Sequence, residues 1–168
     1  NGGTKDVSDF PLFVNDTPVI SGVTNTYQPD NYVVSETGDP GYSSTIDNGC
    51  DEQGNVTLSY GDDKTCYITN DDIAPTLTLI KTVVTDDGGT ATEVDFQAYI
   101  GDDPVDWNQS QTLGVGSYTV SEEPLDGYAP SSWSGDCDEN GNVTLAEGQN
   151  KTCYITNDDI APTLTLIK

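Results

Sequence analysis

Apolar residues along this chain occur in short runs that alternate with polar residues, and no stretch repeats them at the spacing of a helix. Alternation with a period of two is typical of strands that bury one face. Clusters of glycine, proline, asparagine and aspartate separate the runs, as turns do. The pattern therefore predicts an all-β protein. The expected strands are residues 10–14, 32–36, 55–60, 65–70, 76–85, 94–100, 117–122, 142–146 and 152–157.

The chain contains an internal repeat. The segment KTCYITNDDIAPTLTLIK occurs at residues 64–81 and again, without a change, at residues 151–168. Similarity continues upstream, where CDEQGNVTL matches CDENGNVTL and YVVSETGDPGY matches YTVSEEPLDGY. Tandem similarity of this kind indicates two copies of one structural module. Tight hairpin turns are expected at Gly54-Asn55 and Asn140-Gly141.

The two modules differ in their first strand. TLTLIK precedes the second module, whereas nothing equivalent precedes the first, and the last TLTLIK has no module after it. The expected division is residues 1–74 for repeat one, 75–160 for repeat two and 161–168 for a C-terminal donor strand. The residues of the expected donor strand are Thr163, Leu164, Thr165, Leu166, Ile167 and Lys168.

A sheet without its edge strand exposes unpaired backbone groups, which a strand from a neighbour satisfies. We therefore expect the C-terminal strand to insert into repeat one of another copy. Donor and acceptor surfaces differ, so the contact would build an open head-to-tail homopolymer. The same pattern is expected of a two-repeat window from a long tandem polyprotein, and this alternative stays open.

Each module contains one pair of cysteines. The pairing expected from the repeat is Cys50 with Cys66 and Cys137 with Cys153, each across a strand, turn and strand. Such a link contributes about 3 kcal/mol in a small module. A metal site is disfavoured because histidine and the CxxC motif are absent. Disulfides indicate an oxidising, extracellular compartment, and the chain is interpreted as a mature secreted segment.

The net charge is −24, with five lysines and no arginine. This charge argues against nucleic acid and anionic membranes as partners. No apolar run approaches the roughly 18 residues of a membrane span. The chain also lacks a nucleophile motif and a phosphate loop, so an enzyme is the least expected class.

The order of TLTLIK, YTVSEEPLDGY and CYITND resembles the Cna-B, or SpaA-type prealbumin-like, domains of bacterial pilins and surface adhesins. The cysteine-bearing form is similar to prealbumin-like repeats of large secreted microbial proteins. Strand number and spacing already favour a small sandwich. The resemblance implies two tandem immunoglobulin-like or transthyretin-like sandwiches, in a structural subunit of an extracellular filament, pilus or cell-surface stalk. The alternative is an adhesin repeat of a large secreted polyprotein that binds surface glycans.

The resemblance also implies an autocatalytic isopeptide bond between Lys81 and Asn157, assisted by Glu122. Alternation along the strands places all three side chains on inward faces. Burial would lower the pKa of the lysine and raise that of the glutamate, leaving a neutral amine and a proton-carrying acid. The alternative is structural: Lys81 reaches solvent at a strand end, Glu122 bonds a loop and Asn157 caps a turn.

In the first module the matching residues are Glu36 and Asn70, but the matching lysine is missing. Lys5 and Lys64 lie at other positions of the repeat. Lys168, in the unpaired C-terminal copy, has the right sequence context. We therefore expect an intersubunit bond from Lys168 to Asn70, assisted by Glu36.

Three further features are weaker. Exposed aromatic candidates for glycan binding are Trp107, Trp133, Tyr128 and Tyr42. The acidic residues that follow the two CYIT strands, at 70–72 and 157–159, are candidates for a Ca²⁺ ion at the inter-domain junction. N-x-[ST] sequons make these asparagines candidates for glycosylation: Asn15, Asn55, Asn108, Asn142 and Asn150.

Overall fold

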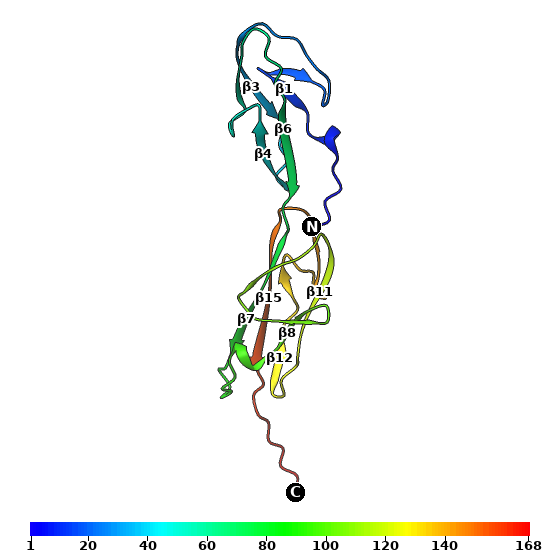
Figure 1. The fold of residues 1–168 in the computed structure, drawn as a ribbon. Coiled ribbons are helices and arrows are strands. Elements are labelled where there is room, and N and C mark those ends of the chain that lie inside the picture. Colours follow the sequence, from blue (N-terminus) through cyan, green and yellow to red (C-terminus); the bar gives the residue numbers. More distant parts are fainter. The chain divides into compact units, whose positions relative to one another are not determined.

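The computed structural model describes residues 1–168 and consists of strands, turns and loops without an α-helix (Figure 1). Two three-residue 3-10 turns, η1 (Val7–Asp9) and η2 (Glu93–Asp95), precede the first strand pair of each repeat. None of the helical turns has the length or apolar character needed to cross a membrane. The chain forms two compact units: residues 2–73, here the N-terminal unit, and residues 74–168 with Asn1, here the C-terminal unit.

The C-terminal unit has two four-stranded sheet paths. One has the order β10-β7-β15-β12, with the short β13 also paired to β15, and the other has the order β14-β11-β8-β9. The strands are β7 (Thr76–Val84), β8 (Ala98–Ile100), β9 (Asp103–Val105), β10 (Ser110–Thr112), β11 (Gly116–Glu122), β12 (Tyr128–Pro130), β13 (Ser134–Gly135), β14 (Asn142–Leu145) and β15 (Asn150–Asp159).

Strand β7 occupies an interior position of its sheet. It runs parallel to β15, with Leu79 opposite Cys153, and antiparallel to β10. Because alternate residues of a strand face one way, Leu77, Leu79 and Lys81 all point into the core and are buried. The other members of this core are Phe96, Ala98, Ile100, Trp107, Val120, Cys137, Val143, Leu145, Cys153 and Ile155.

The N-terminal unit repeats one of these sheets and lacks half of the other. Its order β2-β1-β3-β5 corresponds to β9-β8-β11-β14, but its second sheet contains only β4 and β6. Nothing corresponds to β7, and residues 24–26, which align with β10, form no strand. One edge of β6 therefore has no partner. The strands are β1 (Leu12–Val14), β2 (Thr17–Val19), β3 (Asp30–Glu36), β4 (Tyr42–Asn48), β5 (Asn55–Leu58) and β6 (Cys66–Asp72).

The missing strand leaves the N-terminal unit with a thin core. Phe10 and Cys50 are its only fully buried apolar side chains. Seven other apolar residues are half-buried, although their counterparts in the C-terminal unit are buried. These seven are Leu12, Val14, Val34, Val56, Leu58, Cys66 and Ile68.

The expected tight turns are present, but the prediction that they form hairpins is wrong. Gly54 and Gly141 do make tight turns with positive φ angles of 80° and 82°. However, β5 pairs with β3, and β14 pairs with β11, so neither turn joins two paired neighbours. The strand that follows each turn crosses to the other sheet, because each sheet face must be covered by the other.

The last eight residues, 161–168, contain no secondary structure, pair with no strand and are exposed. Leu164, Leu166 and Ile167 are 85%, 88% and 93% exposed. In the identical sequence at β7, Leu77 and Leu79 are 0% and 1% exposed. One sequence therefore exists here in a buried and in an unpartnered form.

Candidate functional site

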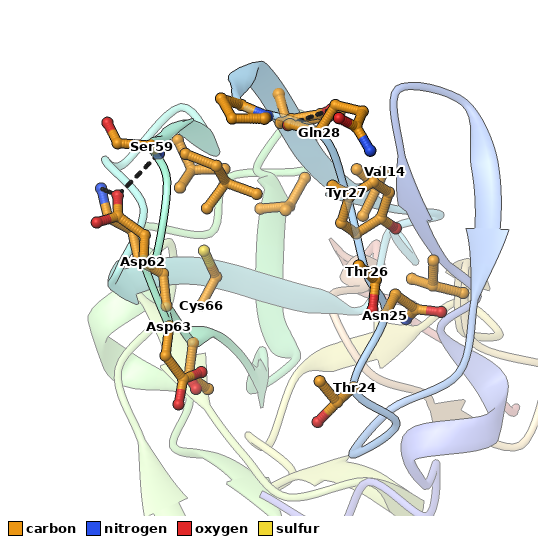
Figure 2. A pocket seen from close by; sticks show the side chains of 18 of the residues that line it. Val14, Thr24, Asn25, Thr26, Tyr27, Gln28, Ser59, Asp62, Asp63 and Cys66 are labelled. Carbon is orange, nitrogen blue, oxygen red and sulfur yellow. Dashed lines mark hydrogen bonds and ion pairs between the residues drawn. The ribbon is translucent and has the colours of Figure 1, made fainter.

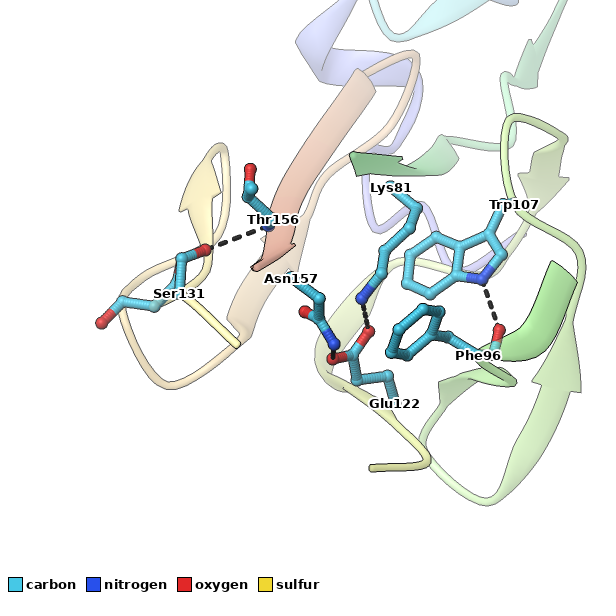
Figure 3. A network of polar contacts seen from close by, with 8 residues as sticks. Lys81, Phe96, Trp107, Glu122, Ser131, Thr156 and Asn157 are labelled. Carbon is cyan, nitrogen blue, oxygen red and sulfur yellow. Dashed lines mark hydrogen bonds and ion pairs between the residues drawn. The ribbon is translucent and has the colours of Figure 1, made fainter. Parts of the chain in front are cut away.

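Three polar side chains meet inside the C-terminal unit, between its two sheets. Lys81 Nζ on β7 forms an ion pair with Glu122 Oε2 at the end of β11. Asn157 on β15 donates from Nδ2 to Glu122 Oε1 at 2.7 Å. Figure 3 shows Lys81 and Asn157 converging on this one carboxyl group. The three residues expected to form the isopeptide site are thus brought together.

The surroundings of Lys81 are apolar. Its side chain is 0% exposed, and Nζ lies 4.1 Å from the centroid of the Phe96 ring and 5.3 Å from that of Trp107. Burial lowers the pKa of Lys81, against the hydrogen bond and charge of Glu122, which act to raise it. Lys81 does not reach solvent, so its amine loses its proton more readily than the amine of a surface lysine.

Phe96 and Trp107 were not expected at this site. Phe96 follows η2, and its carbonyl oxygen accepts a 2.6 Å hydrogen bond from the Trp107 indole N–H. This bond holds the indole beside the lysine, as Figure 3 shows. The sequence signal available was weak: each is a large aromatic residue near a strand end.

The carboxamide of Asn157 has only one of its two polar atoms hydrogen-bonded. Its Oδ1 atom is buried without a hydrogen-bond partner. A half-turn about Cβ–Cγ would exchange Oδ1 and Nδ2 and bring Oδ1 against Glu122. In that orientation the carbonyl group would face the Glu122 carboxyl group, and a hydrogen bond there would polarise it toward attack by an amine. A buried unpaired acceptor is rare and costs free energy, which distinguishes this site from an ordinary strand end.

The N-terminal unit contains the same pair without the lysine. Asn70 on β6 donates from Nδ2 to Glu36 Oε2 at 2.9 Å, and Glu36 Oε1 is buried without a partner. Lys5 instead pairs with Asp39 at 3.1 Å. Lys64 donates to the Thr57 carbonyl oxygen at 2.7 Å. Neither lysine occupies the position that Lys81 has in the other unit.

A groove of about 790 Å³ opens in the N-terminal unit along the unpaired side of its core. Figure 2 shows residues Thr24 to Gln28 along one wall and Ser59 to Asp63 along the other, with Cys66 between them. These walls correspond to the places where β10 and the start of β15 flank β7. The apolar lining consists mainly of Val14, Tyr32, Val34, Val56, Leu58 and Cys66.

Both cysteine pairs form disulfides, Cys50–Cys66 and Cys137–Cys153. The expected geometry differs in detail. Neither disulfide spans a hairpin, because β5 and β6 lie in different sheets, as do β14 and β15. In the N-terminal unit the bridge closes beside the β4–β6 ladder, where Asn48 faces Cys66.

The acidic junction has a structural use. The carboxylates of Asp86, Asp87 and Asp159 lie within 4.8 Å of one another. Asp159, however, is buried and accepts hydrogen bonds from the backbone N–H groups of Asp87 and Gly89. Its oxygens hold the loop after β7, so we assign no cation to this cluster.

The aromatic candidates for glycan contact are used in packing. Trp107 stacks on Trp133 with ring centroids 6.3 Å apart. Tyr128 packs against Phe96, and its hydroxyl accepts the N–H of Ala91 at 2.8 Å. Tyr42 packs against Phe10 in the same way.

All five sequon asparagines are exposed. In three of them the amide nitrogen donates a hydrogen bond: Asn55 to Asp51 at 2.9 Å, Asn108 to Glu93 at 2.9 Å and Asn142 to Asp138 at 3.0 Å.

Comparison with protein families gives a match over residues 72–155, half of the chain, to the prealbumin-like fold domain (SpaA_2). The chain belongs to the prealbumin-like fold family. The matched residues include all of β7 and Glu122, and they end two residues before Asn157. The expected resemblance to SpaA-type prealbumin-like domains is thereby confirmed.

Among solved structures, one match of this prealbumin-like chain is the major pilin protein (T-13) from Streptococcus pyogenes serotype GAS131465. The identity is 17%, the TM-score is 0.33, and the match covers 77% of this chain. The chain spans 66% of that pilin's length, just under two thirds. A search of the curated proteins found no match.

Proposed function

We propose that this protein is a structural, non-enzymatic repeat of an extracellular filament, pilus or surface stalk, in which copies join head to tail by strand donation. Residues 161–168 of one copy insert into the N-terminal unit of the next, beside β6. The observation that carries this proposal is the groove that opens at the start of β6, beside Thr65 and Cys66, in a unit that has no counterpart of β7. The two disulfides fit an extracellular location.

The fit of donor and groove is supported by sequence identity. The tail repeats the first six of the nine residues of β7, and β6 repeats the sequence of β15 from Cys153 to Asp159. Transfer of the β7–β15 register places Leu166 opposite Cys66 and Lys168 opposite Ile68. Transfer of the β7–β10 register places Thr165 opposite Thr24. The inserted strand would then be bonded on both edges.

Burial supplies the driving force. Leu164 and Leu166 would enter the groove as Leu77 and Leu79 enter the core of the C-terminal unit. Burying one leucine side chain contributes about 1.5–3 kcal/mol. The half-buried residues of the groove would lose their solvent contact at the same step, so one event completes both the sheet and the core.

The test compares three full-length chains: unaltered, Leu166→Asp and Thr165→Asp. Leu166→Asp places a charge on the inward face of the donor strand, whereas Thr165→Asp adds the same charge on its outward face. Sedimentation and electron microscopy should reveal head-to-tail polymers for the unaltered chain and for Thr165→Asp. Leu166→Asp should remain monomeric. Polymerisation of Leu166→Asp at unaltered strength would refute strand donation.

Within the C-terminal unit we propose that Lys81 and Asn157 condense to an isopeptide bond. The neutral Lys81 amine attacks Asn157 Cγ, a proton passes through Glu122 to Nδ2, and ammonia leaves as the Cγ–Nδ2 bond breaks. The proposal rests on the shared carboxyl group and on the lowered lysine pKa. The bond would staple β7 to β15 in a single reaction without turnover.

Intact mass under denaturing conditions tests this bond. The unaltered chain should be lighter than its sequence by one ammonia in addition to the hydrogens of two disulfides. Asn157→Ala and Lys81→Met should show no ammonia loss. A full-length mass without that loss in the unaltered chain would contradict the proposal and leave strand donation untouched.

A further inference from the structure

The N-terminal unit contains an unfinished lysine site. Glu36 Oε2 accepts from Asn70, while Glu36 Oε1 is buried with no donor in reach. In the C-terminal unit the equivalent carboxyl group uses one oxygen for Asn157 and the other for Lys81. A carboxyl oxygen without a partner is costly to bury, and a cationic donor would remove that cost.

We propose that Glu36 and Asn70 form the receiving half of a lysine-binding site, and that Lys168 of another copy completes it. The inference rests on the proposed strand donation and adds a polar contact at the end of the donor strand. Because the C-terminal TLTLIK repeats β7, Lys168 stands in the strand where Lys81 stands. The Lys168 ammonium then donates to Glu36 Oε1, as Lys81 does to Glu122.

The other lysines are unavailable for this role. Lys5, Lys64 and Lys81 are held by Asp39, the Thr57 carbonyl and Glu122 respectively. Lys151 donates to the Thr144 carbonyl at 2.8 Å. Lys168, on the exposed tail, is the one lysine of the five without a bonded partner. The tail thus has one lysine without a partner, and the Glu36 carboxyl group has one buried oxygen without a donor.

The site also fixes the register of the donor strand. The donor residues alternate threonine and leucine, so a slip of two residues along β6 would still place leucine on the inward face. Only one register places the ammonium beside Glu36 Oε1. A slipped strand would leave that oxygen unpaired and put Lys168 against apolar groove residues such as Leu58 or Val56.

The test is a double-mutant cycle in the full-length chain. Lys168→Met and Glu36→Gln remove the two partners with little change in size, and the concentration for half-maximal assembly is measured by sedimentation. Each change alone should raise this concentration at least about tenfold. The double variant should need no higher concentration for half-maximal assembly than the single variant that assembles less well. The reason is that the two single variants and the double variant all lose the same interaction.

Two matched variants control for indirect effects. Glu52→Gln alters an exposed carboxyl group of the same N-terminal unit and should leave the assembly concentration unchanged. Lys168→Arg retains the charge and should retain most of the affinity. Lys168 lies on an exposed tail, so Lys168→Met remains informative even if Glu36→Gln perturbs the fold of its own unit.

Peptide mapping of assembled material gives an independent readout. A Lys168–Asn70 cross-link with loss of one ammonia would place Lys168 at this site directly. If Lys168→Met assembles as well as the unaltered chain, and no such cross-link forms, the lysine site is refuted while strand donation stands. If the unaltered chain does not assemble at all, the proposed function itself fails.

Discussion

The two units of this protein share a repeat but differ by one strand, and most of their structural differences follow from it. In the C-terminal unit, β7 lies between β10 and β15 and carries two core leucines and a buried lysine. The N-terminal unit has no counterpart of β7. There, residues 24–26 do not form a strand, and the apolar residues around the gap are only half-buried. A single central strand thus organises two neighbours, a core and a polar site.

The largest expected effect comes from truncating the same residue in the two copies of TLTLIK. Leu79→Ala should lower the free energy of unfolding of the C-terminal unit by about 2–5 kcal/mol, because it opens a cavity in a closed core. Leu166→Ala should leave it unchanged. Both tryptophans lie in the C-terminal unit, so tryptophan fluorescence in urea reports that unit alone. Equal losses from both changes would mean that the tail packs on its own chain.

The disulfides should matter by about 3 kcal/mol each on loop-entropy grounds, since both join residues 16 apart. The consequence differs between units. Replacing Cys50 and Cys66 together by serine should unfold the thin-cored N-terminal unit and expose it to limited proteolysis. Replacing Cys137 and Cys153 should lower the urea midpoint of the C-terminal unit without unfolding it. Reversed sensitivities would contradict the assigned difference in core.

The turns that the units share should respond alike. Gly54 and Gly141 have positive φ, and a Cβ at either would collide with the carbonyl oxygen of Val34 or Val120. Gly54→Ala and Gly141→Ala should each destabilise their unit by about 1–3 kcal/mol. Proteolysis follows the first variant and tryptophan fluorescence the second. A loss of stability in only one unit would show that the two turns are not equivalent, although the strand order around them is the same.

The smallest effect concerns pH and distinguishes Lys81 from a surface lysine. In Asn157→Ala, which cannot cross-link, burial holds the pKa of Lys81 below its unfolded value of 10.5. Between the two values the unfolded chain binds more protons, so stability should rise with pH toward 10.5. Urea midpoints across alkaline pH measure this slope. Adding Lys81→Met to Asn157→Ala should remove this dependence of stability on pH. An unchanged slope would mean that other titrating groups cause it.

Much of the fold follows from the sequence pattern, because long alternating runs bury one face. Each expected strand overlaps an observed one, including β7, β11 and β15. The strands that the pattern missed are short or polar. For example, β10 reads Ser-Gln-Thr and exists through its pairing with β7. Strand pairing of this kind is a tertiary effect that no local pattern encodes.

The polar site was predictable in part. Alternation placed Lys81, Glu122 and Asn157 on inward faces, since side chains two apart share a face. The apolar rings that surround the lysine were not predictable, because Phe96 and Trp107 come from a 3-10 turn and a loop. The unpaired oxygen of Glu36 was not predictable either, because the sequence does not show which hydrogen-bond donors lie within reach of it.

The parallel pairing of β7 and β15 has a mechanical consequence. Tension along the chain would enter at Thr76, the first residue of β7, and leave at Asp159, the last of β15. These residues lie at opposite ends of a ladder of nine paired positions. The load therefore acts along the strands, and the inter-strand hydrogen bonds share it in shear instead of opening one after another. A donor strand seated on β6 in the same register would resist traction between copies in the same manner.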